Sequence, residues 1–152
     1  MEDIELIRLK ELPIDDLQPL LEEGRKQGFT FLDRLVTGYV NGSNRFGKPG
    51  EALFGVYCDQ RLIAIGGLNQ DPYLQKEDVG RVRHVYVLSS WRKQGIGKRL
   101  VQRIIKEAKT HYRLLTLRTP SEQADRFYRA IGFKTAPEIQ NASHHLAVAR
   151  ND

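Results

Sequence analysis

The sequence has little of what a disulfide-stapled or membrane-embedded protein needs. Its 152 residues include one cysteine, Cys58, so the chain by itself cannot form an internal disulfide. No apolar run approaches the roughly 20 residues that cross a bilayer, and the opening residues MEDIELIRLK lack the apolar stretch of a secretory signal. We therefore expect a cytoplasmic protein with no membrane partner, in which Cys58 is a small core residue.

Internal repeats, low-complexity tracts and a linker between domains are also missing. A chain of 152 residues is long enough to bury roughly two thirds of its unfolded surface in one core. We therefore expect a single domain over residues 1–152.

Acidic side chains are missing from one long segment. The whole chain has 24 Lys and Arg against 19 Asp and Glu, a formal charge of +5, yet no acid occurs between residues 81 and 106. The cations of this segment are Arg81, Arg83, Arg92, Lys93, Lys98, Arg99, Arg103 and Lys106. Such a segment favours an anionic partner without choosing among nucleic acid, nucleotide cofactor and acidic metabolite.

Hydrophobic periodicity predicts an α/β fold with a mixed central β-sheet flanked by helices. Alternation predicts strands, and apolar residues spaced three to four apart predict helices, the first beginning near Asp15 or Asp16. A two-residue turn at Asp59-Gln60 indicates a β-hairpin, which argues against an all-parallel sheet. The expected strands are 4–9, 51–58, 61–69, 79–88, 112–119 and 144–149, and the expected helices are 13–29, 31–40, 95–108 and 121–133, with a loop over 41–51.

The segment SWRKQGIGKRL, residues 90–100, places Gly95 and Gly97 where the predicted fourth strand passes into the longest helix. A Walker A loop requires glycine where Arg92 stands and Ser or Thr where Arg99 stands. A Rossmann fingerprint requires glycine or alanine where Leu100 stands. Both common phosphate-loop motifs are therefore excluded.

The cations beside these glycines still indicate a phosphate. Arg92, Lys93 and Lys98 lie at the start of a helix, where positive charge costs roughly 0.3–1 kcal/mol per residue unless an anion compensates. Glycine allows the backbone to approach a ligand closely, and a helix N-terminus presents unpaired N–H groups. A bound phosphate or pyrophosphate accounts for all three features, whereas glycines alone are equally compatible with a strain-free turn.

Two motifs together resemble the GNAT superfamily of acyl-CoA-dependent N-acyltransferases. Arg92, Gly95 and Gly97 complete the pattern [QR]-x-x-G-x-[GA] between a strand and a long helix. The segment RFYRAIGF, residues 126–133, resembles the late helix of that family, with Tyr128 at its aromatic position. The resemblance covers residues 50–135 strongly and implies a single-domain GNAT-like fold.

The resemblance also implies a function and a site. It implies transfer of an acetyl group from acetyl-CoA to a primary amine of a small molecule or peptide, directly within a ternary complex, and homodimers are common in the family. Tyr128 is the expected general acid for the leaving thiolate, and the Val85 backbone N–H is the expected oxyanion contact. The implied coenzyme contacts are Val87, Leu88, Arg92, Lys93, Gln94, Gly95, Ile96, Gly97 and Lys98. For Arg99 and Arg103, a solvated helix face is favoured over contact with the 3′-phosphate.

The general base does not follow from the resemblance. Relatives with a strand-borne Glu base place it where this chain has Arg81, which cannot accept a proton. Strand alternation turns His84 away from Arg81 unless a bulge intervenes, and Glu51 and Tyr86 are weak candidates. Deprotonation through water is therefore our default hypothesis. Arg81 and Arg83 share a face of the strand and are a candidate pair for a carboxylate or phosphate on the acceptor.

Two other functions are compatible with parts of the sequence, and a metal site is not. A non-catalytic CoA-binding regulatory module is the alternative motivated by the absent Glu, although retention of Tyr128 argues against it. Nucleic-acid binding suits the charge, but Trp91 is the main stacking aromatic beside the cations, so no nucleic-acid partner is expected. His144 and His145 point to opposite faces of a strand without a third ligand, so no metal is expected.

Overall fold

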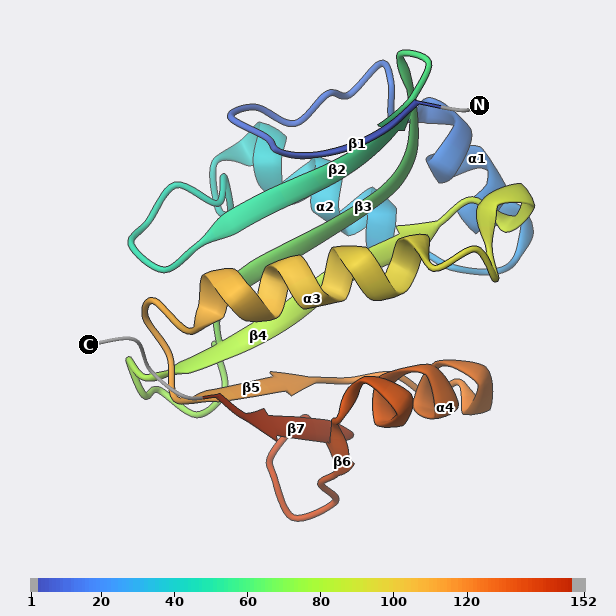
Figure 1. Ribbon diagram of the computed structural model, residues 1–152. Helices are drawn as coiled ribbons and strands as arrows, with labels where there is room; N and C mark the ends of the chain where they lie inside the picture. Colours follow the sequence, from blue (N-terminus) through green and yellow to red (C-terminus); the bar gives the residue numbers. More distant parts are fainter. Residues whose placement is uncertain (1–2, 149–152) are drawn as a thin grey trace.

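The computed structural model describes residues 3–148, and the expected hydrophobic patterns fold there into the following strands and helices (Figure 1). The strands are β1 (Ile4–Arg8), β2 (Ala52–Cys58), β3 (Arg61–Gln70), β4 (Val79–Val87), β5 (Leu114–Leu117), β6 (Lys134–Thr135) and β7 (His144–Ala147). The helices are α1 (Gln18–Lys26), α2 (Phe31–Asn41), α3 (Ile96–Ala108) and α4 (Glu122–Ile131), with the short 3₁₀ turn η1 (Ser89–Trp91) after β4.

The strands form one mixed sheet in the order β1-β2-β3-β4-β5-β7-β6. Only β4 and β5 pair in parallel among the described strands, and every other neighbour is antiparallel. The mixed α/β fold expected from the central hairpin is therefore confirmed. The two-residue strand β6 was not predicted, because so short a run carries no alternation.

Helices cover both faces of the sheet. Leu100, Val101 and Ile104 of α3 lie in one core with Tyr128 of α4, while the leucines of α1 and α2 form a second core on the opposite face. Figure 1 shows α3 crossing in front of β3 and β4, with α1 and α2 behind. Cys58 is buried in the first core, as expected. Within residues 3–148 no helix is long and apolar enough to cross a membrane.

The helix starts and turns follow the sequence with one exception. Ser121 caps α4 by accepting a hydrogen bond from the Ala124 N–H at 3.1 Å, and Gly95 precedes α3 with a left-handed backbone. The expectation that Asp15 or Asp16 begins the first helix is wrong, because α1 begins at Gln18 without a side-chain cap. Asp16 instead accepts a hydrogen bond from the Tyr57 hydroxyl at 2.9 Å.

The hairpin turn is confirmed, and the last strand is shorter than expected. Asp59 and Gln60 have φ values of 49° and 69°, as a turn with two left-handed residues requires, and Cys58 pairs with Arg61 across it. The final strand ends at Ala147, and Ala149, which was expected to extend it, lies outside the described residues.

A bulge interrupts β4 where it pairs with β3. Ile65 pairs with Tyr86 and Gly67 pairs with Arg83, so Gly66 alone faces both His84 and Val85. His84 has a φ of 60°, a left-handed conformation that accommodates the extra residue. Val85 therefore packs toward α3, and the next residue, Tyr86, packs toward α1 and α2.

The other edge of β4 loses its partner soon after β4 begins. The parallel register with β5 consists of Val79 with Leu114, Gly80 with Leu115, and Arg81 with Thr116. In the described part of the chain no β4 residue beyond Arg81 pairs with β5, although β4 continues to Val87. Figure 1 shows the two strands diverging toward α4. The second half of β4 therefore borders a break in the strand pairing between β4 and β5, which we call the opening.

The start of β4 makes a close contact that a substitution can test. A Cβ atom at Gly80 would lie 2.6 Å from Cδ2 of Tyr112, whose side chain is fully buried. We expect Gly80→Ala to lower the free energy of unfolding by about 1–3 kcal/mol, the usual cost of overpacking. Gly47→Ala is the matched control, because nothing lies within 4 Å of its Cβ position. Denaturant unfolding of both variants measures the difference, and equal stability would show that Tyr112 moves aside freely.

Candidate functional site

The loop before α3 presents a row of unused backbone donors. Within residues 3–148, the N–H groups from Lys93 to Lys98 have no hydrogen-bond partner, and the first bond of the helix runs from the Arg99 N–H to the Gly95 carbonyl at 3.0 Å. Lys93 and Gly95 have φ values of 64° and 82°. Left-handed residues alternating with ordinary ones turn successive N–H groups toward a common anion. No acid stands in the first turn of α3, so the positive end of the helix is not compensated there.

Arg92 is placed differently from the other residues of this loop. Its N–H donates to the Ser89 carbonyl, and its Nε donates to the Val87 carbonyl at 2.9 Å. The guanidinium also lies over the Tyr86 ring, 5.3 Å from its centroid. Arg92 therefore holds β4 and the loop together, and the row of free donors begins at Lys93, one residue later than the motif implies.

Glu23 of α1 anchors the same corner, and sequence reasoning missed it. Its Oε1 accepts hydrogen bonds from the Tyr86 hydroxyl at 2.6 Å and the Ser89 N–H at 2.8 Å, and its Oε2 accepts one from the Ser89 hydroxyl. Burial opposes ionisation, but these donors and Arg92 outweigh it and hold the pKa of Glu23 below its usual value. The first helix is thereby tied to the end of β4.

The two motif glycines serve different purposes. A Cβ atom at Gly97 would lie 3.2 Å from Cζ of Phe127 and 3.5 Å from Cγ2 of Val87. Gly97 thus lets the first turn of α3 approach both α4 and β4. Gly95 has nothing within 4 Å of its Cβ position, and its requirement for glycine comes from its φ of 82°.

Tyr128 of α4 follows Phe127, the residue that contacts Gly97, and lies in the core on the α3 side of the sheet. It is 8% exposed and its ring packs edge-on against Phe127 and Phe133, with centroids 5.0 and 5.5 Å away. Its hydroxyl makes no hydrogen bond to any residue from 3 to 148. Burial raises the pKa of Tyr128, so the phenol keeps its proton at neutral pH. The ring is fixed while the hydroxyl remains available to a ligand.

A hydrogen bond between His144 and Asp125 holds the helix that carries Tyr128. His144 of β7 is 3% exposed, and its Nε2 lies 2.7 Å from Oδ1 of Asp125 on α4. Its Nδ1 lies 2.7 Å from the Ser143 hydroxyl, and its ring is 6.3 Å from that of Tyr128. His144 therefore has a structural partner on each nitrogen. No group of three or more potential metal ligands occurs among the described residues.

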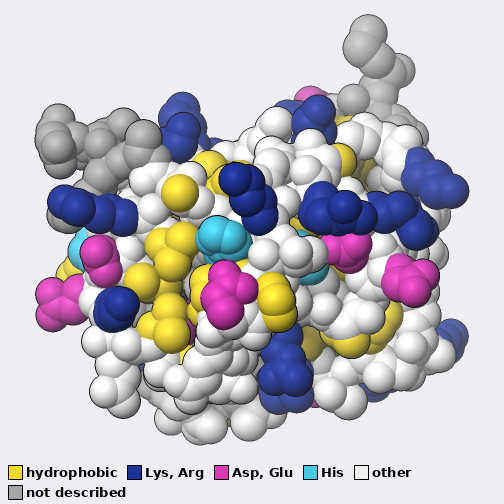
Figure 2. Space-filling view, turned by 90° about the horizontal axis from the view of Figure 1, so that it is seen from below, with side chains coloured by type: hydrophobic (Ala, Val, Ile, Leu, Met, Phe, Trp, Pro, Cys, Tyr) yellow, Lys and Arg dark blue, Asp and Glu magenta, His cyan; other side chains and the backbone are white. Residues whose placement is uncertain are grey.

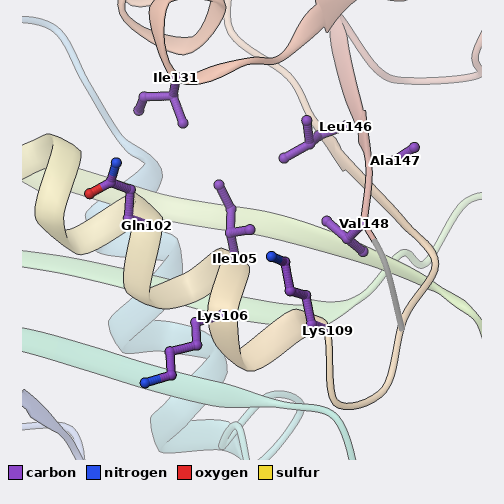
Figure 3. Close-up of a pocket in the computed structure, with 8 residues that line it drawn as sticks. All are labelled: Gln102, Ile105, Lys106, Lys109, Ile131, Leu146, Ala147 and Val148. Atoms are coloured by element: carbon purple, nitrogen blue, oxygen red, sulfur yellow. The ribbon is translucent and has the colours of Figure 1, made fainter. Parts of the chain in front are cut away.

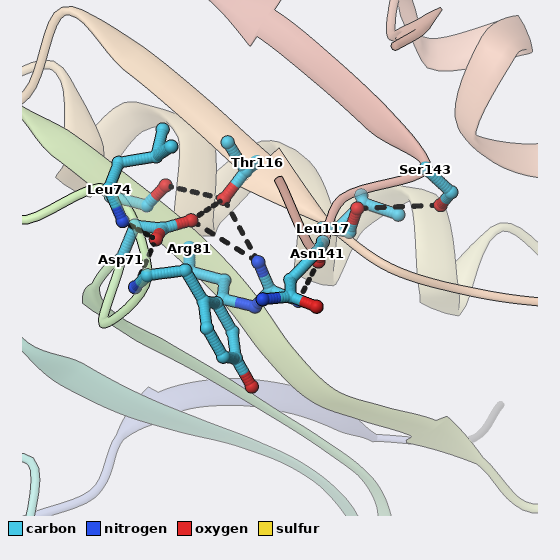
Figure 4. A network of polar contacts seen from close by, with 9 residues as sticks. Asp71, Leu74, Arg81, Thr116, Leu117, Asn141 and Ser143 are labelled. Atoms are coloured by element: carbon cyan, nitrogen blue, oxygen red, sulfur yellow. Dashed lines mark hydrogen bonds and ion pairs between the residues drawn. The ribbon is translucent and has the colours of Figure 1, made fainter. Parts of the chain in front are cut away.

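Arg81 is committed to a buried network and is not free to bind an acceptor (Figure 4). Its Nη1 lies 3.2 Å from Oδ2 of Asp71, and its Nη2 donates to the Asn141 carbonyl at 2.7 Å. The Thr116 hydroxyl donates to the same Asp71 oxygen. Burial alone would raise the pKa of Asp71, but Thr116, the N–H groups of Leu74 and Tyr73, and Arg81 together lower it. This network joins β4 to β5 at their last paired residues.

The bulge changes the expected direction of His84. Strand alternation predicted that His84 points away from Arg83, but the extra residue places both on the side of α2. The His84 ring lies 6.2 Å from that of Phe46, and its Nδ1 is buried without a hydrogen-bond partner among the described residues. Burial, Arg83 and Arg34 lower the pKa of His84 to about 3, although the Phe31 backbone opposes them. The imidazole is therefore neutral at physiological pH.

The outer face of α3 carries side chains with partners of their own. Arg103 forms an ion pair with Glu107 at 3.1 Å and lies over the Phe54 ring, 4.7 Å from its centroid, which favours the solvated-face interpretation. A groove of about 420 Å³ lies between the second half of α3 and β7 (Figure 3). Its lining residues are Gln102, Ile105, Lys106, Lys109, Ile131, Leu146, Ala147 and Val148. Figure 2 shows hydrophobic side chains gathered on the left of the lower face, with Lys and Arg along its upper border.

Comparison with known proteins agrees with the fold and the motif. A sequence profile described as acetyltransferase (GNAT) family matches residues 14–133. A provisionally assigned acetyltransferase from Exiguobacterium sp. 255-15 is 32% identical, with a TM-score of 0.84 over 95% of this chain and 93% of that one. A GNAT family acetyltransferase from Staphylococcus aureus Mu50 shares the fold at 17% identity, with a TM-score of 0.70 over 96% of this chain and 99% of that one. A search of curated proteins found no match.

The buried network of Arg81, Asp71 and Thr116 predicts how the free energy of unfolding depends on pH. Asp71→Asn leaves the Arg81 guanidinium buried without a counterion, so we expect it to lower the free energy of unfolding at pH 7 by about 3–5 kcal/mol. The folded-state pKa of Asp71 lies below its ordinary 3.8, so the wild type keeps this contribution above that pH and loses it as the pH falls through the folded-state value. The gap between the two proteins should therefore narrow below pH 3.8.

Denaturant titrations at several pH values measure the difference in unfolding free energy between wild type and Asp71→Asn. Asp33→Asn is the control, because its partner Arg25 is 55% exposed and the pair is screened by water. A gap that stays constant from pH 7 to pH 3 would mean that the Asp71 charge is not what stabilises Arg81.

Proposed function

The chain belongs to the acetyltransferase (GNAT) family, and from that membership we propose that it moves an acetyl group from acetyl-CoA to a primary amine of a small molecule or peptide. The observation that carries the proposal is the row of N–H groups from Lys93 to Lys98 that have no partner within residues 3–148 and that follow the end of β4. In direct transfer both substrates are bound at once. We place the acetyl-CoA donor on the α3 side of the sheet and the acceptor on the α2 side, so that they meet at β4.

The donor side suits a coenzyme that carries a pyrophosphate. The free N–H groups and the positive end of α3 provide backbone donors for the phosphates, and Lys93 and Lys98 add positive charge. Within residues 3–148, β4 beyond Arg81 has no β5 partner, so we assign the extended pantetheine arm to this edge, near Val85 and Val87. The Leu88 N–H, expected to contribute as well, already donates to the Ile63 carbonyl at 2.9 Å, and the Val87 carbonyl is taken by Arg92 Nε. When bound, acetyl-CoA supplies an acetyl group activated as a thioester.

The protein contributes proton transfers and polarisation to the reaction. The Val85 backbone N–H is assigned to the acetyl carbonyl oxygen, where negative charge develops as the amine attacks. A carbon–nitrogen bond forms, the carbon–sulfur bond breaks, and the Tyr128 hydroxyl gives its proton to the departing sulfur. The phenol then regains a proton from water. The reactants and products balance as thioester plus amine giving amide plus thiol.

The amine must lose two protons overall if it arrives as an ammonium ion. An ordinary alkyl ammonium has a pKa near 10.4, so one proton leaves before attack and the second leaves as the amide forms. His84 is a weak base, because the pKa of its protonated form is about 3. Arg81 cannot accept a proton. We therefore assign both protons to water in the opening.

Removing the Tyr128 hydroxyl tests the general acid. We expect Tyr128→Phe to lower the rate of acetyl transfer by about 10²–10⁴-fold, measured as thiol release in a single turnover. Because this hydroxyl bonds to no described residue, the unfolding free energy should stay within about 0.5 kcal/mol of wild type. Affinity for acetyl-CoA should also be unchanged.

Tyr39→Phe is the matched control for this variant. Tyr39 lies in α2, where Arg45 stacks on its ring 5.6 Å from the centroid, and its hydroxyl also lacks a hydrogen bond within residues 3–148. The Tyr39→Phe variant should transfer the acetyl group at the wild-type rate. A Tyr128→Phe variant as fast as wild type in the chemical step would assign the thiolate proton to another group.

Distorting the glycine loop tests the coenzyme position. A β-branched residue is strained at the φ of 82° found for Gly95, so Gly95→Val should displace the neighbouring N–H groups. Loss of one hydrogen bond to a charged phosphate corresponds to about a tenfold or greater rise in the dissociation constant for acetyl-CoA. Titration calorimetry measures it.

Gly42→Val provides the comparison, because Gly42 ends α2 with a φ of 83° and only Arg45 atoms at 3.9 Å. Gly42→Val introduces the same kind of backbone strain, but at the end of α2 and not in the loop before α3. Equal affinities for acetyl-CoA in the two variants would place the pyrophosphate elsewhere.

A further inference from the structure

We propose that the acceptor amine carries an anionic group, a carboxylate or a phosphate, which binds Arg83 of β4 with support from Arg34 of α2. The inference rests on the acetyl transfer proposed above and names the class of acceptor. It replaces the Arg81–Arg83 pair expected from strand alternation, because Arg81 is held by Asp71.

Arg83 lies beside the position assigned to the acetyl group. It is the last β4 residue paired with β3 before the bulge, two residues ahead of Val85 and beyond the last residue that pairs with β5. Its partner Gly67 faces Phe46, since a Cβ atom there would lie 2.6 Å from Cε1 of that ring. Side chains of paired residues share a face, so Arg83 points to the side of the sheet that carries Phe46 and His84.

The charge of Arg83 has no partner of its own. Its side chain is half-buried, yet within residues 3–148 it makes no hydrogen bond and no ion pair. Burial first, then the neighbouring Arg81 and Arg34, lower the pKa of Arg83. A half-buried guanidinium without a counterion is costly, and its planar fork matches a carboxylate or phosphate in two parallel hydrogen bonds.

One carboxylate, Glu51, raises the pKa of Arg83, but it forms no ion pair with that arginine within residues 3–148. Its Oε1 accepts a hydrogen bond from the Lys48 N–H at 3.1 Å. Its Oε2 accepts one from the Asn69 amide at 2.7 Å. Glu51 is thus held in the loop before β2 and does not bond directly to Arg83.

The surroundings make an anion the matching ligand. Arg34 is exposed on α2 and acts on both Arg83 and His84, so two cations from different elements face this region. His84 stays neutral and adds no further charge. Together the two arginines attract an anionic acceptor and repel a polycationic one.

The spacing limits the size of the acceptor. Arg83 and Val85 are two residues apart, and even a fully extended chain would place their Cα atoms no more than roughly 7 Å apart. We therefore expect a small acceptor whose anion and amine are a few bonds apart. Amino acids and aminoalkyl phosphates have this spacing.

A panel of matched acceptors tests the inference by thiol release. The pairs are glycine with glycinamide, and O-phosphoethanolamine with ethanolamine, and cadaverine serves as a dication. We expect the anionic member of at least one pair to have the higher kcat/KM, and the pair that shows it identifies the anion as carboxylate or phosphate.

Variants then assign the preference to Arg83. Arg83→Gln should lower the ratio of anionic to neutral kcat/KM by about ten- to a hundredfold, mainly through the acceptor KM, and leave the KM for acetyl-CoA unchanged. Comparing ratios between proteins cancels the difference in amine basicity. Arg34→Gln should have a smaller, salt-sensitive effect because it is exposed. Arg61→Gln, an exposed arginine at the start of β3, is the control of equal charge change and should leave the ratio as in wild type.

A binding measurement keeps the inference separate from the proposed function. The imidazole signal of His84 in NMR spectra should shift saturably with N-acetylglycine or inorganic phosphate in wild type and not in Arg83→Gln. If acetyl-CoA is used but neutral or cationic amines react as well as anionic ones, the inference is wrong and the acetyltransferase proposal stands. If no amine on the panel reacts, the His84 titration decides: a shift lost in Arg83→Gln supports the inference, and no saturable shift overturns it.

Discussion

The site depends on a single constraint, the loss of strand partners along β4. Up to Arg81 the strand is paired on both sides, but beyond it β5 departs, and at His84 the pairing with β3 is interrupted by the bulge. Inside a sheet, the neighbouring strands normally satisfy the backbone N–H and C=O groups of each strand. A strand that loses a neighbour in the middle of the sheet therefore has donors and acceptors available for a ligand. The Arg81–Asp71–Thr116 network fixes where the strands part, because it joins them at their last pair.

The elements around this opening are tied to one another by charge as well as by packing. Glu23 links α1 to the end of β4 and to Ser89, and Arg92 links the same strand end to the loop before α3. On the other side, His144 bonds to Asp125 and so holds α4, which carries Tyr128, against β7. The loop before α3, the helix that carries Tyr128 and helix α1 are therefore held by three independent contacts, which favours a preformed site over one assembled by the ligand.

The sequence predicts the local parts of this arrangement and misses the long-range ones. Helix α3, the Ser121 cap and the Asp59-Gln60 turn follow from periodicity and local chemistry, and the glycine motif locates the loop because its residues are adjacent in the chain. Glu23 with Ser89, and Asp71 with Thr116, join residues far apart in sequence, and no local pattern marks such pairs. For His84, alternation gives the opposite face from Arg83 unless a bulge intervenes; the bulge is present, and no local pattern in the sequence could locate it.

In the proposed reaction, the two faces of the sheet at this bulge offer different kinds of group to the donor and the acceptor. On the α3 side these are backbone N–H groups, which carry no net charge and can donate hydrogen bonds to any phosphate of suitable shape. On the α2 side, the extra residue brings His84 onto the face of Arg83, where burial keeps the imidazole neutral and leaves the guanidinium as the dominant charge. Arg81, where the family resemblance implies a Glu base in some members, is a buried structural cation that cannot accept a proton. Because the Asp71 carboxylate neutralises that cation, the positive field on the α2 side comes from Arg83 and Arg34, and in the proposed reaction it would act on the acceptor.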